Sequence, residues 1–497
     1  MKCITVLAAP ACLAACLLGS SIRAATSILA PPAAPGAATL PYVKTKASVI
    51  VLRHARVIDG AGTAAQEDRT VILRDGNIVA VGDAALAAPD GAAVHDLSGH
   101  TVLPGLVGMH DHMFYIGSPN SDAHGHSEPP LLVPQMTFSA PRLYLAAGVT
   151  TLRTTGSVET YADLNLKAMI DAGELPGPHL DVTGPYLEGP GSAFVQMRRL
   201  RDVEDARRFV EFWADEGVTS FKAYTNITRA QLKAAIDAAH KRGLKITGHL
   251  CSVTYPEAAA LGIDNLEHGF FVNTQNDPDK APDTCPQSAG LPTLLGMHPE
   301  GPQATALIKL LVERKVAITS TLPVFEQFVP GHAPLDPRAM TVLTPQAREA
   351  LLYSRDRLNT APREFTARIA EAFKMTMALE RRFAQAGGLL LVGPDPTGSG
   401  GVVPGFGDHR AIELLVEAGF SPVEAIKVGT LNGATYLGLA DRIGSIAPGM
   451  RADLLVVKGD PSKAIADIRN VAIVFKDGVG YDPDKLLDSV RGRYGQY

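Results

Sequence analysis

Short apolar runs alternate with segments of helical periodicity from residue 105 onward, and this alternation constrains the fold most strongly. Segments such as RAQLKAAIDAAHKRG (229–243), with apolar side chains three and four residues apart, are typical of amphipathic helices. Eight strand-then-helix units predict an α/β chain built as a (β/α)8 TIM-like barrel, whereas an open sheet of six or seven strands is the alternative. The eight runs are GLVGMHDH (105–112), VTTLRTT (149–155), HLDVTG (179–184), TSFKAY (219–224), LKITGHL (244–250), NLEHG (265–269), VAITSTL (316–322) and LLLVGPD (389–395).

Strand-like segments of another kind lie on both sides of this region. VIVLRHARVIDGAG and RTVILRDGNIVAVGD are apolar runs broken by turn signals, and Asp75-Gly76 predicts a hairpin turn. Near the C-terminus, RADLLVVKGDP and AIVFKDGV return to the same pattern. We expect the two ends of the mature chain to pair as one small β-sandwich, formed by residues 47–104 and 441–497 around a barrel of residues 105–440.

The first residues have the pattern of an export signal. A lysine precedes an apolar run from residue 3 to residue 18, so residues 1–25 are predicted to be a signal peptide of a periplasmic or secreted protein. The alternative is a lipoprotein, because LAAC resembles a bacterial lipobox and would make Cys16 a lipid anchor. The alanine- and proline-rich residues 26–46 are expected to be a linker, and no other segment has the pattern of a membrane span.

Charge and cysteine content narrow the possible partners. The formal net charge is −5 and no long basic run occurs, which argues against nucleic acid and favours a small-molecule substrate. Of five cysteines, only Cys251 and Cys285 lie beyond the leader. Export permits a disulfide between them, and two separate thiols are the alternative.

Two histidines stand one residue apart at the end of the first barrel run. Because side chains alternate along a strand, His110 and His112 are expected to face the same side, the barrel interior. They also lie at the C-terminal end of the strand, where barrel enzymes hold their active sites. Taken alone, a histidine at the end of a strand is more often a packed, hydrogen-bonded residue than a metal ligand.

Four other runs also end in a side chain that can bind metal. Lys222 closes TSFK, and a lysine facing the barrel interior is costly unless it is paired or chemically changed. The other three are His249, His268 and Asp395. Several imidazoles and a carboxylate converging on one face suit a divalent metal such as Zn²⁺, so the six residues together predict a metal site.

Other polar residues in the barrel region are expected to serve other roles. His124 and His126 lie in a loop and are predicted to be solvated, and His179 is assigned to structure. Glu267 precedes His268, so alternation predicts that it faces away from the interior and supports the barrel wall. His409 precedes a helix in the loop after the last strand, where it either contacts substrate or serves as a polar residue at a helix start.

The motifs GLVGMHDH, SFKAY, KITGHLCS, NLEHGF and VGPD resemble those of the amidohydrolase superfamily, in its binuclear branch with a carboxylated lysine. The resemblance covers about residues 47–480 and is closest to the imidazolonepropionase-like and Xaa-Pro dipeptidase (prolidase) subgroup, whose Lys-x-Tyr matches Lys222-Ala223-Tyr224. It implies two divalent metal ions, zinc being the first choice, and a homo-oligomer. The implied ligands are His110, His112 and Asp395 for one ion and His249 and His268 for the other, with Lys222, carboxylated by CO₂, between them.

The resemblance also implies a mechanism for hydrolysing C–N bonds. A water between the metals would ionise near neutral pH and attack the substrate carbonyl. Asp395 would act as general acid and base, taking the water's proton and passing it to the leaving amine. Tyr224 is expected either to hydrogen-bond the substrate oxygen or to form an aromatic wall. These roles predict an amidase, a dipeptidase or a cyclic-amide hydrolase.

Three alternatives stay open at the level of sequence. A mononuclear deaminase of the same superfamily is disfavoured, because Lys222 is present and no glutamate stands three residues after His249. A lactonase would use the same hydroxide on an ester carbonyl. A metal-free barrel acting as a binding or scaffold protein is the non-enzymatic alternative, and retention of all six ligands argues against it.

Overall fold

The computed structural model describes residues 27–117, 131–192, 194–397 and 400–495. The expected signal peptide, Cys16, His124 and His126 lie outside these residues. Within the described ranges, no helix combines the length and apolar character needed to cross a lipid bilayer.

All eight apolar runs form strands, as the sequence predicts. The strands are parallel and belong to two sheets, one in the order β7-β8-β9 and one in the order β10-β11-β12-β13-β14. Their bounds are β7 (Leu106–Gly108), β8 (Val149–Arg153), β9 (His179–Asp181), β10 (Ser220–Ala223), β11 (Lys245–Gly248), β12 (Asn265–Glu267), β13 (Ala317–Ser320) and β14 (Leu390–Val392).

Backbone hydrogen bonds join the two parallel sheets at both of their edges. Thr219 N donates to Val182 O at 2.9 Å, which links the segment before β10 to the end of β9. Met109 N donates to Val392 O at 3.0 Å, which links the end of β7 to β14. The edge strands of both sheets therefore have partners for their backbone polar groups.

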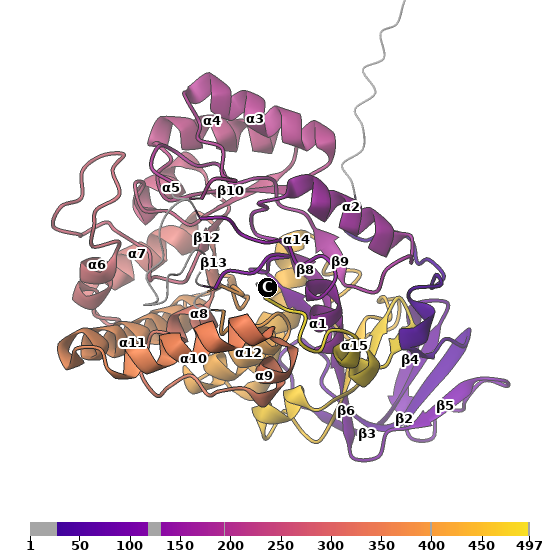
Figure 1. The fold of residues 1–497 in the computed structure, drawn as a ribbon. Helices are drawn as coiled ribbons and strands as arrows, with labels where there is room; N and C mark the ends of the chain where they lie inside the picture. Colours follow the sequence, from indigo (N-terminus) through magenta and orange to yellow (C-terminus); the bar gives the residue numbers. More distant parts are fainter. Residues whose placement is uncertain (1–26, 118–130, 193, 398–399, 496–497) are drawn as a thin grey trace, which may run out of the picture.

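Helices follow the parallel strands and surround them (Figure 1). Their starts follow local sequence rules, since Thr228 and Thr254 each form a capping box with the residue three positions on. The helices are α1 (Ala140–Ala146), α2 (Thr160–Asp171), α3 (Val203–Glu216), α4 (Arg229–Lys241), α5 (Tyr255–Leu261), α6 (Leu291–Gly296), α7 (Pro302–Glu313), α8 (Leu322–Glu326), α9 (Pro337–Val342), α10 (Pro345–Asn359), α11 (Arg363–Gln385), α12 (Phe406–Glu417), α13 (Pro422–Lys427), α14 (Gly433–Leu437) and α15 (Pro483–Ser489).

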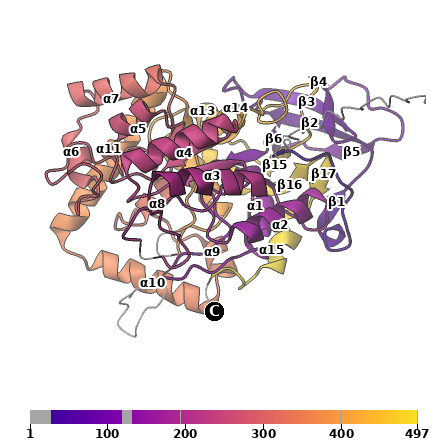
Figure 2. The ribbon, with the colours of Figure 1, turned by 90° about the horizontal axis from the view of Figure 1, so that it is seen from above.

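The two ends of the described chain pair with each other, as expected (Figures 1 and 2). Strand β6 runs antiparallel to β15, with Leu103 opposite Leu455. The predicted hairpin joins β3 to β4, and Asp75 and Gly76 at its turn have φ values of 47° and 80°. The strands are β1 (Val43–Thr45), β2 (Val49–Val57), β3 (Gln66–Arg74), β4 (Asn77–Asp83), β5 (Ala93–Asp96), β6 (His100–Pro104), β15 (Leu454–Lys458), β16 (Val471–Lys476) and β17 (Val479–Tyr481).

These strands are hydrogen-bonded into one continuous nine-stranded sheet. The register of β2 against β3 shifts between Leu52 and Ala55, and His54 within that shift has a φ of 56°. Such a bulge bends a strand and increases its twist. The first half of β2 therefore pairs with β5 and its last residues pair with β6, so that both halves of the unit stay hydrogen-bonded.

The segment expected to be a linker is packed from residue 27 onward. Val43 in β1 pairs with Tyr481 in β17, at the edge of the nine-stranded sheet. Thr39, which is fully buried, donates a hydrogen bond to Gly173 O at 2.9 Å. The sequence alone did not reveal these contacts because their partners lie far away along the chain.

A disulfide joins Cys251 to Cys285, with their Cα atoms 4.8 Å apart. Cys251 lies two residues beyond His249, and Cys285 belongs to the long segment after β12. The crosslink ties this segment to the strand ends where the polar side chains gather.

Candidate metal centre

The six predicted ligands come together at the C-terminal ends of the parallel strands. His110 and His112 follow β7, and His268 directly follows β12. Lys222 lies within β10, His249 directly follows β11, and Asp395 follows β14. The shared direction of the strands is what brings these residues together from positions far apart in the sequence.

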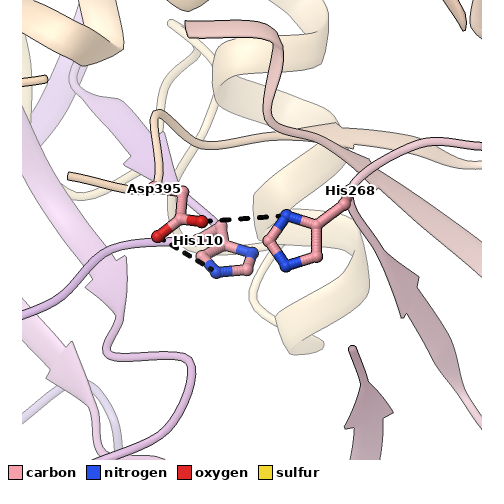
Figure 3. A group of neighbouring side chains, drawn as sticks. All are labelled: His110, His268 and Asp395. Carbon is pink, nitrogen blue, oxygen red and sulfur yellow. Dashed lines mark ion pairs between the residues drawn. The ribbon is translucent and has the colours of Figure 1, made fainter. Parts of the chain in front are cut away.

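Asp395 approaches three of the histidines, and Figure 3 shows its ion pairs with His110 and His268. Its Oδ1 is 3.2 Å from His112 Nε2 and 3.7 Å from His110 Nε2, and its Oδ2 is 3.7 Å from His268 Nδ1. Donor atoms of His110, His268 and Asp395 lie within 4.8 Å of one another, a spacing that could hold one metal ion.

Lys222 and His249 border this group. Lys222 Nζ is 3.2 Å from His110 Nε2. The ring of His249 lies 4.3 Å from that of His268 and 5.0 Å from that of Tyr224, measured between centroids. The structure thus brings all six predicted ligands and Tyr224 into one cluster.

Hydrogen bonds fix the orientation of the imidazoles. His112 Nδ1 donates to Thr154 O at 2.8 Å, and His110 Nδ1 donates to Glu267 Oε2 at 2.7 Å. Both rings therefore turn Nε2 toward Asp395. His268 Nδ1 contacts Thr321 Oγ1 at 2.9 Å, whereas its buried Nε2 has no hydrogen-bond partner among the described residues. Hydrogen bonds of this kind orient metal-binding histidines, and an unpartnered buried nitrogen fits a missing ion.

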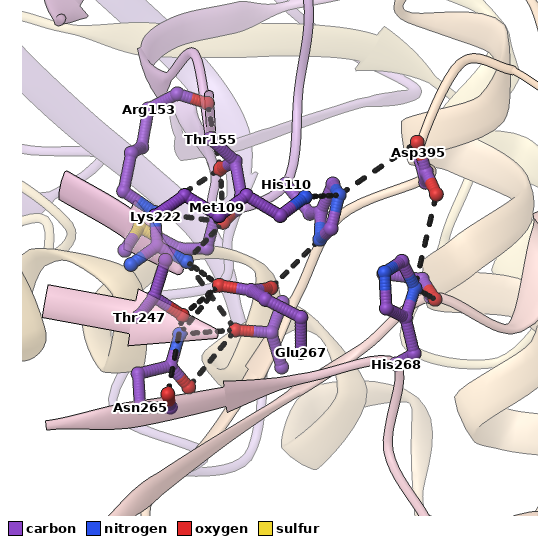
Figure 4. Close-up of polar contacts among 12 residues, drawn as sticks. Met109, His110, Arg153, Thr155, Lys222, Thr247, Asn265, Glu267, His268 and Asp395 are labelled. Atoms are coloured by element: carbon purple, nitrogen blue, oxygen red, sulfur yellow. Dashed lines mark hydrogen bonds and ion pairs between the residues drawn. The ribbon is translucent and has the colours of Figure 1, made fainter. Parts of the chain in front are cut away.

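The prediction for Glu267 is wrong, because its side chain faces the interior (Figure 4). Glu267 is fully buried, and its Oε1 accepts hydrogen bonds from Arg153 at 2.8 Å and from Asn265 at 2.9 Å. Strand β12 ends at Glu267, and His268 has a φ of 68°, so strict alternation stops between them. Consecutive side chains therefore both point inward, and Asn265, two residues before Glu267, was the signal that this face of the strand is polar.

Arg153 is a second residue that the sequence did not single out. Its side chain is fully buried at the end of β8, where it bonds Glu267 and donates through Nε to Met109 O at 3.0 Å. Hydrogen bonds of this kind offset the loss of water when a guanidinium and a carboxylate are buried together, although Arg153 Nη1 has no partner among the described residues. Arg153 and Glu267 therefore form the polar floor on which His110 rests.

Burial sets the charges of the cluster. Burial, reinforced by Lys222, lowers the pKa of His249 to about 3, and burial also lowers the pKa of His110 and His268. Burial alone would raise the pKa of Asp395, but His110, His112 and Lys222 lower it further than burial raises it. At neutral pH the imidazoles are therefore uncharged and the carboxylate is ionised, which are the forms that bind metal.

A cavity of about 230 Å³ opens onto the cluster. Its lining includes His112, Lys222, His249, His268 and Asp395. Tyr224 also lines it, beside Tyr186, whose ring lies 4.8 Å away between centroids. The cluster is thus reachable by a small molecule, and the position of Tyr224 is compatible with both of its predicted roles.

His409 does not reach this cavity. It lies in the first turns of α12, where its Nε2 donates to Ala147 O at 2.7 Å and its Nδ1 contacts Arg338 at 3.2 Å. Both ring nitrogens are therefore engaged elsewhere, and His409 connects α12 to the end of α1. Of the two roles predicted for His409, the structure therefore agrees with that of a polar residue at the start of a helix.

A second group of potential metal ligands lies at the opposite ends of the strands. His179, the first residue of β9, comes close to Asp453 and Asp477, with donor atoms within 4.8 Å of one another. His179 Nε2 is 3.3 Å from Asp477 Oδ1 and 3.5 Å from Asp453 Oδ2. Arg451 and Lys476 also form ion pairs with Asp477, so side chains already balance the charge there.

The fold and the cluster define a metal-binding α/β enzyme scaffold, and comparison with known proteins assigns its family. Residues 101–480 match the amidohydrolase family, so the chain belongs to this family. It is 26% identical over 408 residues to the imidazolonepropionase of Deinococcus radiodurans, an alignment that covers 80% of this chain and 88% of that protein. An adenine deaminase of Desulfatibacillum aliphaticivorans is 47% identical over 66 residues, which is 13% of this chain and only 11% of that enzyme.

Solved structures support the same assignment of fold. A Xaa-Pro dipeptidase with methionine bound in its active site matches 88% of this chain and 100% of its own, with a TM-score of 0.65 and 20% identity. The ochratoxinase of A. niger matches 91% of this chain and 100% of its own, with a TM-score of 0.62 and 16% identity. The predicted resemblance to amidohydrolases of the prolidase-like subgroup is confirmed.

Proposed function

We propose that this chain is a metal-dependent hydrolase of C–N bonds in amides, peptides or cyclic amides. The observation that carries the proposal is the cluster of four imidazoles, one lysine and one carboxylate at the strand ends, of which all but His110 line a single cavity. Membership of the amidohydrolase family supports the same class of reaction.

The donor set fits a pair of divalent ions, for which zinc is the first candidate. His110, His112 and Asp395 would hold one ion, and His249 and His268 would hold the other. We propose that Lys222 bridges them as a carboxylated side chain, because carboxylation converts a buried cation into an oxygen ligand. No ion pair joins Lys222 to a carboxylate in the described part of the chain, and its Nζ faces an imidazole nitrogen instead. This arrangement suits a chemically changed lysine.

Bound divalent ions would lower the pKa of water and polarise a carbonyl group. Asp395 would take a proton at its carboxylate and deliver it to the leaving amine, because it is ionised, central in the cluster and exposed to the cavity. Tyr224 would donate a hydrogen bond from its hydroxyl to the substrate oxygen. Glu267 would keep His110 in one tautomer by accepting a hydrogen bond from its Nδ1–H.

We further propose that the two parallel sheets close into one (β/α)8 barrel spanning residues 105–440. The backbone hydrogen bonds at both sheet edges support this closure. The likeness to solved amidohydrolase folds supports it independently. The segments 47–104 and 441–497 would then form the second unit of the chain.

We propose that the protein is exported, as a periplasmic or secreted enzyme or as a lipoprotein anchored at Cys16. The leader pattern in the sequence supports export. The disulfide between Cys251 and Cys285 supports it as well, because such bonds persist in oxidising compartments.

Metal analysis by mass spectrometry tests the proposal most directly. Mature protein purified in bicarbonate should carry about two metal ions per chain, and Lys222→Ala should lose metal and activity, with partial rescue of activity by a short carboxylic acid. Lys245→Ala is the matched control, because Lys245 is a partly buried strand lysine that bonds Tyr436 O and lies outside the cluster. One ion per chain that survives Lys222→Ala would contradict the bridged pair, and absence of metal would contradict the hydrolase.

A further inference from the structure

The walls of the active cavity differ in character from its floor. The charged groups in its lining are Lys222 and Asp395, and both belong to the cluster of metal ligands. Most of the remaining lining is apolar or aromatic and comprises Phe114, Phe194, Met197, Phe325, Phe328 and four aliphatic residues. The groups that could hydrogen-bond a substrate away from the cluster are the hydroxyls of Tyr186, Tyr224 and Thr397.

Two aromatic rings flank the cluster at close range. Phe114 stacks on His112 with 4.3 Å between centroids. Phe325 meets the ring of His268 edge-on at 5.8 Å, and Phe271 stacks behind it at 3.8 Å. Each of these two phenylalanine rings packs against another aromatic ring. The rings are therefore held in place, and this part of the cavity wall stays apolar.

Away from the proposed metal centre, the described lining of this cavity offers no lysine or arginine to a substrate carboxylate. In the described lining, Lys222 is the one lysine and no arginine occurs. Beyond the leader, the residues outside the described ranges contain neither lysine nor arginine. Arg198 and Arg201 belong to a neighbouring groove, where both pair with Asp205. A carboxylate placed between Phe325 and Phe194 would therefore lose its water without gaining a partner.

We propose that the substrates of this enzyme are uncharged amides, with a blocked amino group, no free carboxylate and an aromatic or bulky aliphatic group against the Phe114, Phe325 and Phe328 walls. The proposal deepens the hydrolase function above and rests on it. A cavity of about 230 Å³ suits a molecule the size of a blocked amino-acid amide. Free dipeptides, which carry an ammonium and a carboxylate, are poor substrates because the described walls of the cavity hold no charged group that could pair with either charge.

Three compounds with the same scissile bond test the inference on the metal-loaded wild-type protein. They are N-acetylphenylalanine pyrrolidide, which is neutral, N-acetylphenylalanylproline, which adds a carboxylate, and phenylalanylproline, which carries both charges. We expect kcat/KM to fall by about tenfold or more with each added charge. A free dipeptide that is cleaved as well as the neutral amide would overturn the proposal.

A charge-insertion variant tests whether the cavity walls cause this selectivity. Phe328 is 41% exposed, so Phe328→Arg can keep its charge in water while reaching the cavity mouth. It should raise the ratio of kcat/KM for N-acetylphenylalanylproline over the pyrrolidide by about tenfold. Phe365→Arg is the control, because Phe365 is 50% exposed on α11 and does not line the cavity. A ratio equal to that of the wild type would contradict the assignment.

Failure of the hydrolase proposal is distinguishable from failure of this inference. If metal-loaded protein cleaves none of the three compounds, the proposed activity is wrong, and their binding to the same preparation is then measured by calorimetry. The neutral amide should bind most tightly. Tighter binding of either charged compound, or no binding of any of them, would overturn the substrate class.

Discussion

Two clusters of histidine and aspartate lie beyond opposite ends of the parallel strands, and the cavity described above opens onto one of them. In the metal-centre cluster, the ion-pair partners of Asp395 among the described residues are three imidazoles. In the His179 cluster, comprising His179, Asp453 and Asp477, the carboxylate of Asp477 also pairs with Arg451 and Lys476. Both clusters meet the same distance criterion for a metal site. The distances between donor atoms therefore do not identify a metal centre by themselves. The two clusters differ in whether nearby cations already neutralise the carboxylates and in whether a cavity gives access to the donor atoms.

The largest expected effect is on catalysis. Asp395→Asn should lower kcat by about a thousandfold or more, because the variant cannot carry the proton, whereas circular dichroism should show an intact fold. The matched variant Asp453→Asn in the His179 cluster should leave kcat within a few-fold of the wild type. If Asp453→Asn also abolished turnover or bound metal, the distinction between the clusters would be wrong.

The next effect concerns the floor of the metal centre. Glu267→Gln leaves Arg153 buried without its carboxylate, which should lower the free energy of unfolding by about 3–5 kcal/mol. Metal affinity should fall about 10- to 100-fold, since His110 loses the acceptor that fixes its tautomer. Chemical denaturation of metal-free protein and a metal titration measure the two effects separately. Glu257→Gln, in the α5 capping box, is the control and should change neither quantity appreciably.

Asp163 is a buried carboxylic acid that forms no ion pair among the described residues, and it contrasts with Asp395 and Asp477, whose neighbours lower their pKa values. Asp163 accepts hydrogen bonds from Gln135 and Ser157, and burial raises its pKa to about 7. The folded state keeps a proton that the unfolded state releases, so stability falls as the pH rises from about 4 to about 7 and is constant above that range. At 1.36 kcal/mol for each of roughly three pKa units, this group should contribute a loss of about 3–4 kcal/mol.

Denaturation of wild type and Asp163→Asn across this pH range measures the effect. The asparagine can accept from Gln135 and donate to Ser157, whose hydroxyl then donates to Thr183 O. The stability of the variant relative to the wild type should therefore increase from pH 4 to pH 7. Parallel stability curves would contradict the raised pKa.

The smallest expected effect is a change in the free energy of unfolding caused by a substitution in the His179 cluster. Asp477→Asn removes the charge that Arg451 and Lys476 share, but an asparagine oxygen can still accept from Arg451. We expect a loss of about 2 kcal/mol in the free energy of unfolding, with metal content and kcat unchanged. Loss of bound metal in this variant would mean that the His179 cluster holds an ion after all.

The sequence predicts well those features that depend on local periodicity and strand direction. The eight parallel strands and the gathering of His110, His112, Lys222, His249, His268 and Asp395 all follow from short apolar runs that end in polar side chains. These predictions succeed because parallel strands all point the same way, so that their ends meet without further information.

The features that the sequence did not predict depend on backbone turns or distant partners. Glu267 faces inward because His268 adopts a positive φ, and no residue type in NLEHG announces that turn. The terminal strands form one sheet because β2 bends near His54, another residue with positive φ. The orientation of His409 depends on Ala147, which lies in a different helical layer. Apart from the polar residues Asn265 and Glu267, which stand two apart, these contacts leave no periodic trace in the chain.

The pairing of β6 with β15 also determines the order in which the molecule can assemble. The N-terminal strands leave the ribosome long before the residues that complete their sheet, so the edge of β6 has no partner until synthesis is nearly finished. Non-local pairing of this kind slows folding and exposes an aggregation-prone edge in the meantime. A chain cut before Leu454 would carry every residue of the metal centre and still present an open sheet edge to any chaperone or protease that it meets.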